Sequence, residues 1–370
     1  MPGVYISYPF CAQKCTYCNF ASGVFPAELE PGYIDALVAE LAAHTWSWQP
    51  ETVYLGGGTP SGMAARDLSR VLTQIPGARV PGPAQWLEAT IEAAPGTITS
   101  ERAAAWASAG INRVSLGVQS FVQRELARTG RKHSAEIVER EVAVLRAAGL
   151  HNFNIDLIAG LPGQTRAAWL ESLKWVERLQ PPHVSVYMLE IDEDSRLGNE
   201  VLLNGKRYGA PDVPSDELTA ELYETAVAEL GRMGIERYEI SNFARPGFES
   251  LHNLKYWRLE PYAGFGADAH SFDGASRSQN IESPSAFVAK TLSGASACVL
   301  ETPANSDEER FFVGLRLMRG IQLQPDDWRR FEGPIQRFLA DGLLARDQER
   351  LRLTDRGVLL SNEVFAEFIT

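Results

Sequence analysis

The first half of the chain alternates between short runs rich in apolar residues and longer stretches in which apolar side chains recur with a helical period. The short runs predict β-strands at residues 3–8, 51–55, 86–92, 112–118, 153–158 and 183–189. The longer stretches predict amphipathic helices at residues 33–46, 66–74, 101–107, 136–148 and 166–179. Because repeated strand–helix units place their strands in parallel, we expect a parallel sheet covered by helices, either open or curled into a barrel.

Residues capable of chemistry follow the carboxyl ends of several of these predicted strands. A cysteine-rich loop follows the first strand and a Gly-Gly-Gly-Thr-Pro turn at 56–60 follows the second, while Glu92 ends the third and Gln119 ends the fourth. A (β/α) barrel collects groups from many strands at this end, whereas a doubly wound sheet concentrates them at one switch point. The spread therefore favours an α/β fold of the incomplete (β/α)6 barrel type.

The pattern changes after the sixth predicted strand. We expect an irregular loop at 192–212, a helix at 215–231, a short strand at 236–240, and an aromatic, Gly-rich, aperiodic stretch at 242–271. Further on we expect helices at 308–318, 325–331, 335–341 and 355–368, and a hairpin made of 343–346 and 351–353. We therefore divide the chain into a partial barrel at 1–240, a connecting region at 241–305 and a small helical, winged-helix-like domain at 306–370. The last unit has no basic stripe, so we expect it to pack on the barrel rather than bind DNA.

Composition and charge narrow the class of protein. The chain has 370 residues, 45% of them hydrophobic and 22% charged, as in ordinary globular proteins. The net charge of −12 argues against nucleic-acid binding and against attachment to anionic lipid by charge alone. No apolar run is long enough to predict a transmembrane helix, and nothing at the start resembles a signal peptide. Four cysteines are too few for a disulfide framework, so we expect a protein of the reducing cytoplasm.

Three of the cysteines form a C-x3-C-x2-C motif, Cys11, Cys15 and Cys18. A complete cysteine cage for an iron–sulfur cluster takes four thiolates, so three from one loop leave one iron of a 4Fe-4S cluster open to a substrate. S-adenosylmethionine (SAM) is the natural occupant of that position. The alternative, a zinc knuckle, needs a fourth ligand nearby, and the nearest histidine in sequence, His44, lies beyond a predicted helix. Cys298 stands apart, and we expect it to be a buried small apolar residue.

Other polar residues at the strand ends suit a zwitterionic amino acid joined to a ribose. Glu92, Gln119, Arg131 and Asp156 supply the required charges and hydrogen bonds, although each alone fits a structural ion pair equally well. The glycines of the 56–60 turn let backbone groups approach a ligand closely.

Together these features resemble the radical SAM superfamily, and within it the coproporphyrinogen dehydrogenase branch of HemN and HemW. The resemblance rests on the cysteine motif, the Gly-Gly-Gly-Thr-Pro turn and residues 5–11, 92–96, 116–120 and 156–165. It implies that the three cysteines hold the cluster. It also implies a SAM site formed by Tyr5, Tyr17, Gly57, Gly58, Thr59, Glu92, Gln119, Arg131 and Asp156. Within that site we expect Gly57 to Thr59 to face the methionyl ammonium and Arg131 to bind the carboxylate.

Two departures and one motif separate the branches. Phe20 stands where coproporphyrinogen dehydrogenases have a fourth cysteine, and the chain begins only ten residues before its cluster loop. Residues 252–257 are similar to the HNxxYW haem-binding motif of HemW-type chaperones, which implies a haem site at His252, Asn253, Tyr256 and Trp257. Imidazole can ligate haem iron and aromatic rings can pack on a porphyrin, but a histidine near aromatic residues is more often a hydrogen-bonded packing residue. His270 is a second candidate ligand.

The resemblance thus implies a HemW-like haem chaperone that carries haem as cargo to a haem-requiring respiratory protein. It also implies a homodimer and transient contact with the inner face of the membrane. Whether the protein is also an enzyme stays open. The alternatives are oxygen-independent oxidative decarboxylation of coproporphyrinogen III and radical chemistry on haem itself.

Overall fold

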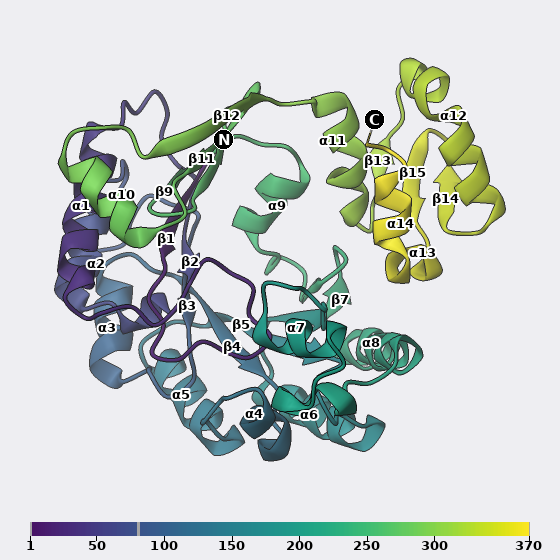
Figure 1. Ribbon diagram of the computed structural model, residues 1–370, viewed down its shortest axis with the longest axis horizontal. Helices are drawn as coiled ribbons and strands as arrows, with labels where there is room; N and C mark the ends of the chain where they lie inside the picture. The colour runs from purple at the N-terminus through teal and green to yellow at the C-terminus, as the bar shows by residue number, and fades with distance from the viewer. Residues whose placement is uncertain (1, 80–81, 370) are drawn as a thin grey trace.

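The computed structural model describes residues 2–79 and 82–369, and its largest element is a curved sheet of twelve strands (Figure 1). Six strands run parallel in chain order: β1 (Gly3–Tyr8), β2 (Thr52–Gly57), β3 (Glu88–Ala93), β4 (Arg113–Gln119), β5 (Asn152–Ala159) and β6 (His183–Met188). They coincide with the six predicted strands to within a few residues. The sheet curves without closing on itself, so the expected incomplete barrel is confirmed.

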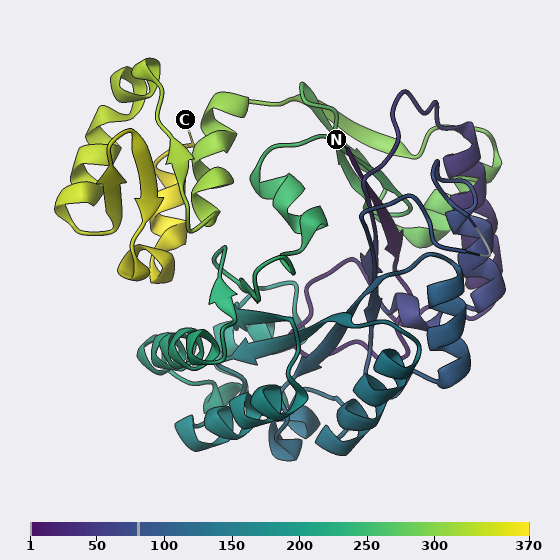
Figure 2. The same cartoon turned by 180° about the vertical axis from the view of Figure 1, so that it is seen from behind.

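Helices cover the convex side of this sheet, as both views show (Figures 1 and 2). They are α1 (Leu29–Ala43), α2 (Ala65–Leu72), α3 (Ser100–Ser108), α4 (Gln123–Arg128), α5 (Ala135–Ala147), α6 (Arg166–Leu179) and α8 (Asp216–Arg232). Only the short α4 was not predicted.

Each barrel strand has an apolar face and a polar face, because successive side chains point to opposite sides of a sheet. In β5, Phe153, Ile155 and Leu157 are buried in the core shared with the helices. Asn154 and Asp156 alternate with them and face the concave side, where the Asn154 amide donates to Asp156 Oδ1 over 2.6 Å. The interior of the barrel is therefore polar.

The segments after β6 contain more regular structure than expected in two places and less in one. Residues 192–212 contain α7 (Arg196–Leu202) and a 3₁₀ segment, η2 (Arg207–Asp212), and the short strand expected at 236–240 covers only β7 (Glu236–Arg237). Residues 242–271, expected to be aperiodic, contain β8 (Asn242–Ala244), α9 (Leu251–Trp257), β9 (Tyr262–Phe265) and β10 (His270–Phe272). These elements are too short to show a period in the sequence.

The later strands extend the same sheet. β9 pairs in parallel with β1, and β10, β11 (Ser276–Asn280) and β12 (Cys298–Pro303) follow it, while β8 and β7 continue the other end beyond β6. α10 (Pro284–Leu292) packs against α1. Cys298 is half-buried at the start of the edge strand β12, and its thiol donates to the Leu300 carbonyl over 3.3 Å. The expectation that it is buried was wrong, because an edge strand leaves one side open to solvent.

The C-terminal unit is built from short helices and a hairpin. Its elements are α11 (Ser306–Phe312), η3 (Gly314–Arg316), β13 (Ile321–Gln322), α12 (Pro325–Ala340), β14 (Leu344–Asp347), β15 (Arg350–Leu353), α13 (Asp355–Leu359) and α14 (Ser361–Ala366). The predicted hairpin is confirmed. The two helices expected at 325–331 and 335–341 are confirmed within α12, because non-helical backbone at Phe331 (φ −120°), three residues before Pro334, forms a kink that divides them. Phe311, Phe331 and Phe368 pack together in the core of the unit, with ring centroids 4.6 to 5.3 Å apart.

Within the described part of the chain, no helix combines the length and the apolar character that crossing a bilayer requires.

Candidate functional site

A cavity of about 620 Å³ opens at the carboxyl ends of the barrel strands. Eleven of the predicted site residues line it: Cys11, Cys15, Tyr17, Cys18, Gly57, Gly58, Thr59, Glu92, Gln119, Arg131 and Asp156. Tyr5 lies behind this wall and stacks on Tyr54, a lining residue, with ring centroids 6.1 Å apart. The fold thus gathers residues that are up to 145 positions apart in the sequence, from Cys11 to Asp156, into one site.

The cysteine loop is fixed at both ends by backbone bonds. The Cys11 amide donates to the Gly23 carbonyl over 2.8 Å, and the Leu197 amide of α7 donates to the Thr16 carbonyl over 2.8 Å. All three thiols are free and half-buried on the cavity wall. Burial raises the pKa of the Cys11 thiol, and hydrogen bonds from Thr59 and Ser22 partly offset the rise.

The thiol arrangement fits a cluster better than a single ion. Among the described residues, no three Cys, His, Asp or Glu side chains converge on a point where one metal ion could sit. Zinc needs four such ligands within about 2.3 Å of one centre. In a cubane each thiolate binds a different iron, so three thiols on one wall of the cavity suit that group.

The glycine turn after β2 is packed against the start of the cysteine loop. Gly57 has φ 103°, which favours glycine, and a Cβ on Gly58 would lie 2.7 Å from the Phe10 carbonyl oxygen. The Gly58 amide donates to Tyr8 O over 2.8 Å and the Thr59 amide to Phe10 O over 2.9 Å. An ammonium only donates hydrogen bonds, so carbonyl oxygens are the groups through which this turn would receive one.

Two carboxylates face the cavity from neighbouring strands. Glu92 accepts from the Tyr54 hydroxyl over 2.9 Å, and burial, reinforced by the charge of Asp156, raises the pKa of Glu92 to about 7. Burial also raises the pKa of Asp156, although hydrogen bonds from Ser185 and Asn154 oppose the rise. The charge of Arg113 lowers both pKa values, but burial outweighs it, and buried carboxylates of this kind are poised to accept hydrogen bonds from a charged or hydroxylated ligand.

Arg131 is held against the wall by two bonds. Its Nε lies 3.1 Å from the Tyr17 hydroxyl, and its Nη1 donates to the Gly117 carbonyl over 2.6 Å. Gln119, at the end of β4, has φ 72°, a left-handed conformation that a non-glycine residue adopts only when its surroundings hold it there. The β4–β5 register shifts between Leu116 and Gln119, which turns this segment toward the cavity.

Four of the lining residues that sequence reasoning missed carry polar groups within the barrel: Tyr54, Ser115, His133 and Tyr187. Three of them lie on the polar faces of strands, so the alternation of polar and apolar residues was a usable signal for them. His133 had no such signal. Burial and the Arg131 charge lower the pKa of His133 to about 4, and its Nε2 has no hydrogen-bond partner within the described chain.

The predicted haem residues lie elsewhere, on α9, inside the curve of the sheet (Figures 1 and 2). Glu88, the first residue of β3, accepts from the amides of Leu251 and His252, each over 2.9 Å, and so caps the amino end of α9. Thr52, the first residue of β2, contacts His252 as well. α9 therefore covers the amino ends of these strands, opposite the cavity.

His252 is 1% exposed and both of its ring nitrogens have partners. Nδ1 lies 2.8 Å from Thr52 Oγ1 and Nε2 lies 2.8 Å from the Tyr256 hydroxyl. The imidazole stacks on Tyr54 with ring centroids 5.2 Å apart, and burial lowers its pKa to about 3. His252 is a neutral, hydrogen-bonded packing residue in this structure.

The other residues of the motif lie beside it. Tyr256 and Trp257 are half-buried, and the Trp257 indole nitrogen has no partner among the described residues, while the Arg316 guanidinium lies 4.4 Å from the Trp257 ring centroid. The backbone N–H of the half-buried Asn253 donates to Ser250 Oγ over 3.4 Å. His270 is exposed on β10.

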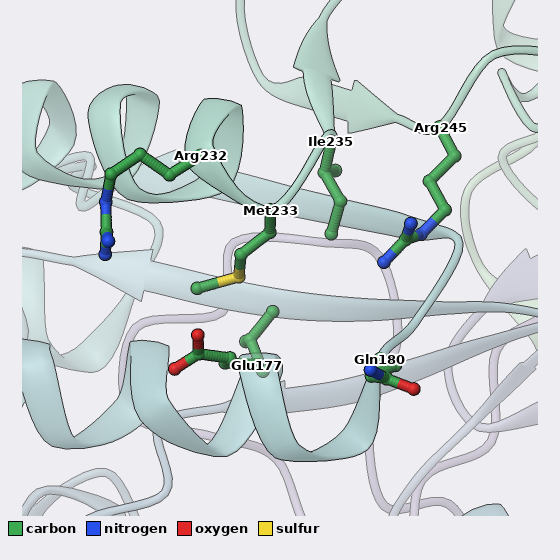
Figure 3. A pocket seen from close by; sticks show the side chains of 7 residues that line it. Glu177, Gln180, Arg232, Met233, Ile235 and Arg245 are labelled. Carbon is green, nitrogen blue, oxygen red and sulfur yellow. The ribbon is translucent and has the colours of Figure 1, made fainter.

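A smaller hollow of about 170 Å³ lies between the ends of α6 and α8 (Figure 3). Glu177 and Arg232 lie at one end of it, and Gln180 and Arg245 lie at the other. It contains no predicted site residue, and Arg232 already pairs with Glu229.

Known proteins match the chain along most of its length. The sequence profile of the Radical SAM superfamily matches residues 5–176, and that of the HemN C-terminal domain matches residues 302–360. The chain is 34% identical to the haem chaperone HemW of Lactococcus lactis, over 99% of this chain and 96% of that protein. It is 33% identical to the haem chaperone HemW of Bacillus subtilis, over 100% and 99%, and 35% identical to that of Mycobacterium tuberculosis, over 98% and 93%.

A solved structure shows the same fold. Coproporphyrinogen III oxidase HemN from Escherichia coli superposes with a TM-score of 0.84 at 22% identity, over 100% of this chain and 90% of that chain. The family implies a 4Fe-4S cluster and SAM, and the cysteine loop and cavity fit both. The chain belongs to the HemW family within the radical SAM superfamily.

Proposed function

We propose that this protein is a haem chaperone, which binds haem and transfers it to a haem-dependent respiratory protein without acting as an enzyme on it. The observation that carries the proposal is the similarity to relatives named as haem chaperones HemW over nearly the whole chain. Phe20 adds support, because it is 66% exposed at the mouth of the cavity where the HemN-type resemblance calls for a fourth cysteine.

In this proposal the cluster and SAM occupy the cavity and haem uses the motif on α9. Cys11, Cys15 and Cys18 would hold the cluster, which supplies redox chemistry when bound. Arg131 would pair with the SAM carboxylate, and Glu92 and Asp156 would accept from its ammonium or ribose hydroxyls. The remaining proposed SAM residues are Tyr5, Tyr17, Gly57, Gly58, Thr59 and Gln119.

For haem, His252 would supply the ligand and Tyr256 and Trp257 the apolar contact, with Asn253 completing the motif. We further propose that the chaperone works in the cytoplasm, docks transiently at the inner face of the membrane, and forms a homodimer. Nucleic acid is not among the proposed partners.

A second candidate function is oxygen-independent coproporphyrinogen III dehydrogenation. The fold likeness to HemN and the complete wall of the SAM cavity favour it. It requires the substrate to enter the cavity, whereas the chaperone requires haem to be bound and released unchanged.

The test is an anaerobic titration of the cluster-reconstituted protein with haem, followed by absorbance. We expect saturable binding near one haem per chain, weakened at least tenfold in His252→Ala. His151→Ala, an exposed histidine outside the motif, is the matched control and should bind like wild type. His270→Ala tests the second candidate ligand. Absence of saturable binding together with coproporphyrinogen turnover would replace the chaperone by the dehydrogenase.

A further inference from the structure

The haem motif and the SAM cavity lie at opposite ends of the barrel interior, yet a continuous line of contacts joins them. His252 stacks on Tyr54 with ring planes 28° apart. The Tyr54 hydroxyl donates to Glu92 Oε1, and Glu92 lines the cavity. Three side chains therefore connect α9 to the proposed SAM site.

His252 cannot bind iron where it now lies. A ring nitrogen ligates iron through a lone pair that no donor occupies, and Thr52 and Tyr256 already occupy both nitrogens of His252. Gly3 leaves little space on the strand side, since a Cβ there would lie 3.1 Å from the imidazole. Haem must therefore displace α9, or at least break one of these two hydrogen bonds.

Displacement of His252 would also affect Tyr54. That ring stacks on both Tyr5 and His252, so loss of His252 removes one of these two stacking partners. The Tyr54 hydroxyl and the Gly57 amide are the hydrogen bonds that hold Glu92 toward the cavity. A group that orients a ligand-binding side chain in this way controls affinity without touching the ligand.

We propose that His252 and Tyr54 are positioning residues for Glu92, so that haem ligation at His252 and SAM binding in the cavity oppose each other. This inference deepens the proposed function and rests on it for the identity of the two ligands. By linkage, SAM weakens haem binding by the same factor by which haem weakens SAM binding. We expect that factor to be fivefold or more, the lower end of measured couplings.

The experiment measures both dissociation constants under anaerobic conditions without reductant, so that binding is read apart from turnover. Ferric haem is titrated by absorbance with and without saturating SAM, and SAM is titrated by calorimetry with and without haem. Wild type should show at least fivefold weaker haem binding when SAM is present.

Two variants test whether this line of contacts couples the haem and SAM sites. Tyr54→Phe keeps the stack on His252 but removes the hydroxyl bonded to Glu92, so haem should bind as in wild type and SAM should no longer affect it. Tyr256→Phe frees His252 Nε2, so haem should bind more tightly. Tyr223→Phe is the matched control, because it removes a buried tyrosine hydroxyl bonded to Ile240 O, outside this line of contacts. It should change neither constant.

The outcomes separate the inference from the function. If SAM leaves the haem constant unchanged in wild type, or if Tyr54→Phe retains the full effect, the coupling is wrong while the chaperone stands. If wild type binds no haem, the proposed function fails. The positioning of Glu92 by His252 and Tyr54 is then tested by SAM affinity alone. His252→Ala and Tyr54→Phe should each bind SAM at least fivefold more weakly without haem, and unchanged affinity in both overturns the inference.

Discussion

Replacing Glu88 by glutamine should loosen α9 specifically. Oε1 of Glu88 accepts from the His252 amide over 2.9 Å and from Ser250 Oγ over 3.3 Å, and Oε2 accepts from the Leu251 amide over 2.9 Å. Glu88 Oε2 also lies 3.9 Å from Arg113 Nε, and both side chains are at most 3% exposed. Glutamine keeps the size and one acceptor but removes the charge.

The expected cost follows from these contacts. Hydrogen bonds to a charged group contribute about 1.5–3 kcal/mol, against about 0.5–1.5 for neutral pairs. In Glu88→Gln one amide bonds to a neutral acceptor, a loss of about 1 kcal/mol, and the other faces the NH2 group and loses its bond. Together these changes cost α9 at least about 2 kcal/mol. If that cost falls on local opening, the amides of α9 open about 30-fold more often, because about 1.4 kcal/mol is a factor of ten.

Hydrogen exchange read by mass spectrometry checks this magnitude. Peptides covering 251–257 should exchange about 30-fold faster in Glu88→Gln, while peptides from α5 keep their wild-type rate. Glu141→Gln is the matched control, since Glu141 is a buried carboxylate that accepts from the Gly96 and Ile98 amides far from α9. Unchanged exchange of α9 in Glu88→Gln, or equal acceleration in α9 and α5, would refute the conclusion that Glu88 caps and holds this helix.

Three further predictions concern the cavity. Burial raises the pKa of Glu92 to about 7, and only its ionised form accepts from SAM donors without first losing a proton. SAM affinity should therefore rise about tenfold from pH 6 to pH 8, as measured by calorimetry at both pH values. The rise should be smaller in Glu92→Gln, in which only the titration of SAM itself remains. Gly58→Ala should weaken SAM binding at least tenfold with an unchanged circular dichroism spectrum, because the added Cβ forces the turn away from Phe10; wild-type affinity would show that the turn does not shape the site. Cys15→Ala should abolish retention of the reconstituted cluster, measured as iron per chain, and Cys298→Ala should not; equal iron content in the two variants would contradict the cluster assignment.

The barrel could be predicted from sequence because its elements carry their own local signals. The bounds of β1 and α6 coincide with the predicted residues, Gly3–Tyr8 and Arg166–Leu179. Thr165 caps α6 by accepting from the Ala168 amide, and Gln180 ends it with φ 47°. Such caps and turns are encoded within a few residues, so reading the sequence locally is enough.

The segment at 242–271 could not be predicted, because distant contacts hold it in place. The cap of α9 comes from Glu88, which precedes His252 by 164 positions. Gly264 lies where a Cβ would be 2.1 Å from the His270 carbonyl oxygen, so its place in a strand depends on a partner that the sequence does not mark. Elements of three to seven residues give no period to read.

The cavity, like the fold, could be predicted in part from the sequence. Its motif residues stand at strand ends, so parallel strands bring them together automatically. The polar inner faces of the strands were not read, and Tyr54, which links the two ends of the barrel, was missed for that reason. A histidine near aromatic residues is more often a hydrogen-bonded packing residue than a metal ligand. The contacts of His252 in this structure are of the packing kind.

The short length of α9 makes it suited to reversible exposure. A helix of seven residues has little stability of its own in water, so its conformation depends on the contacts made by Glu88, Thr52 and Tyr54. A ligand that competes for His252 therefore competes with a few tertiary contacts rather than with a stable helix. A chaperone must release its cargo. Release is easier when the residue that binds the cargo can re-form favourable hydrogen bonds within the protein. Thr52 and Tyr256 provide His252 with such partners, so under the proposed function these contacts would delay haem capture and favour haem release.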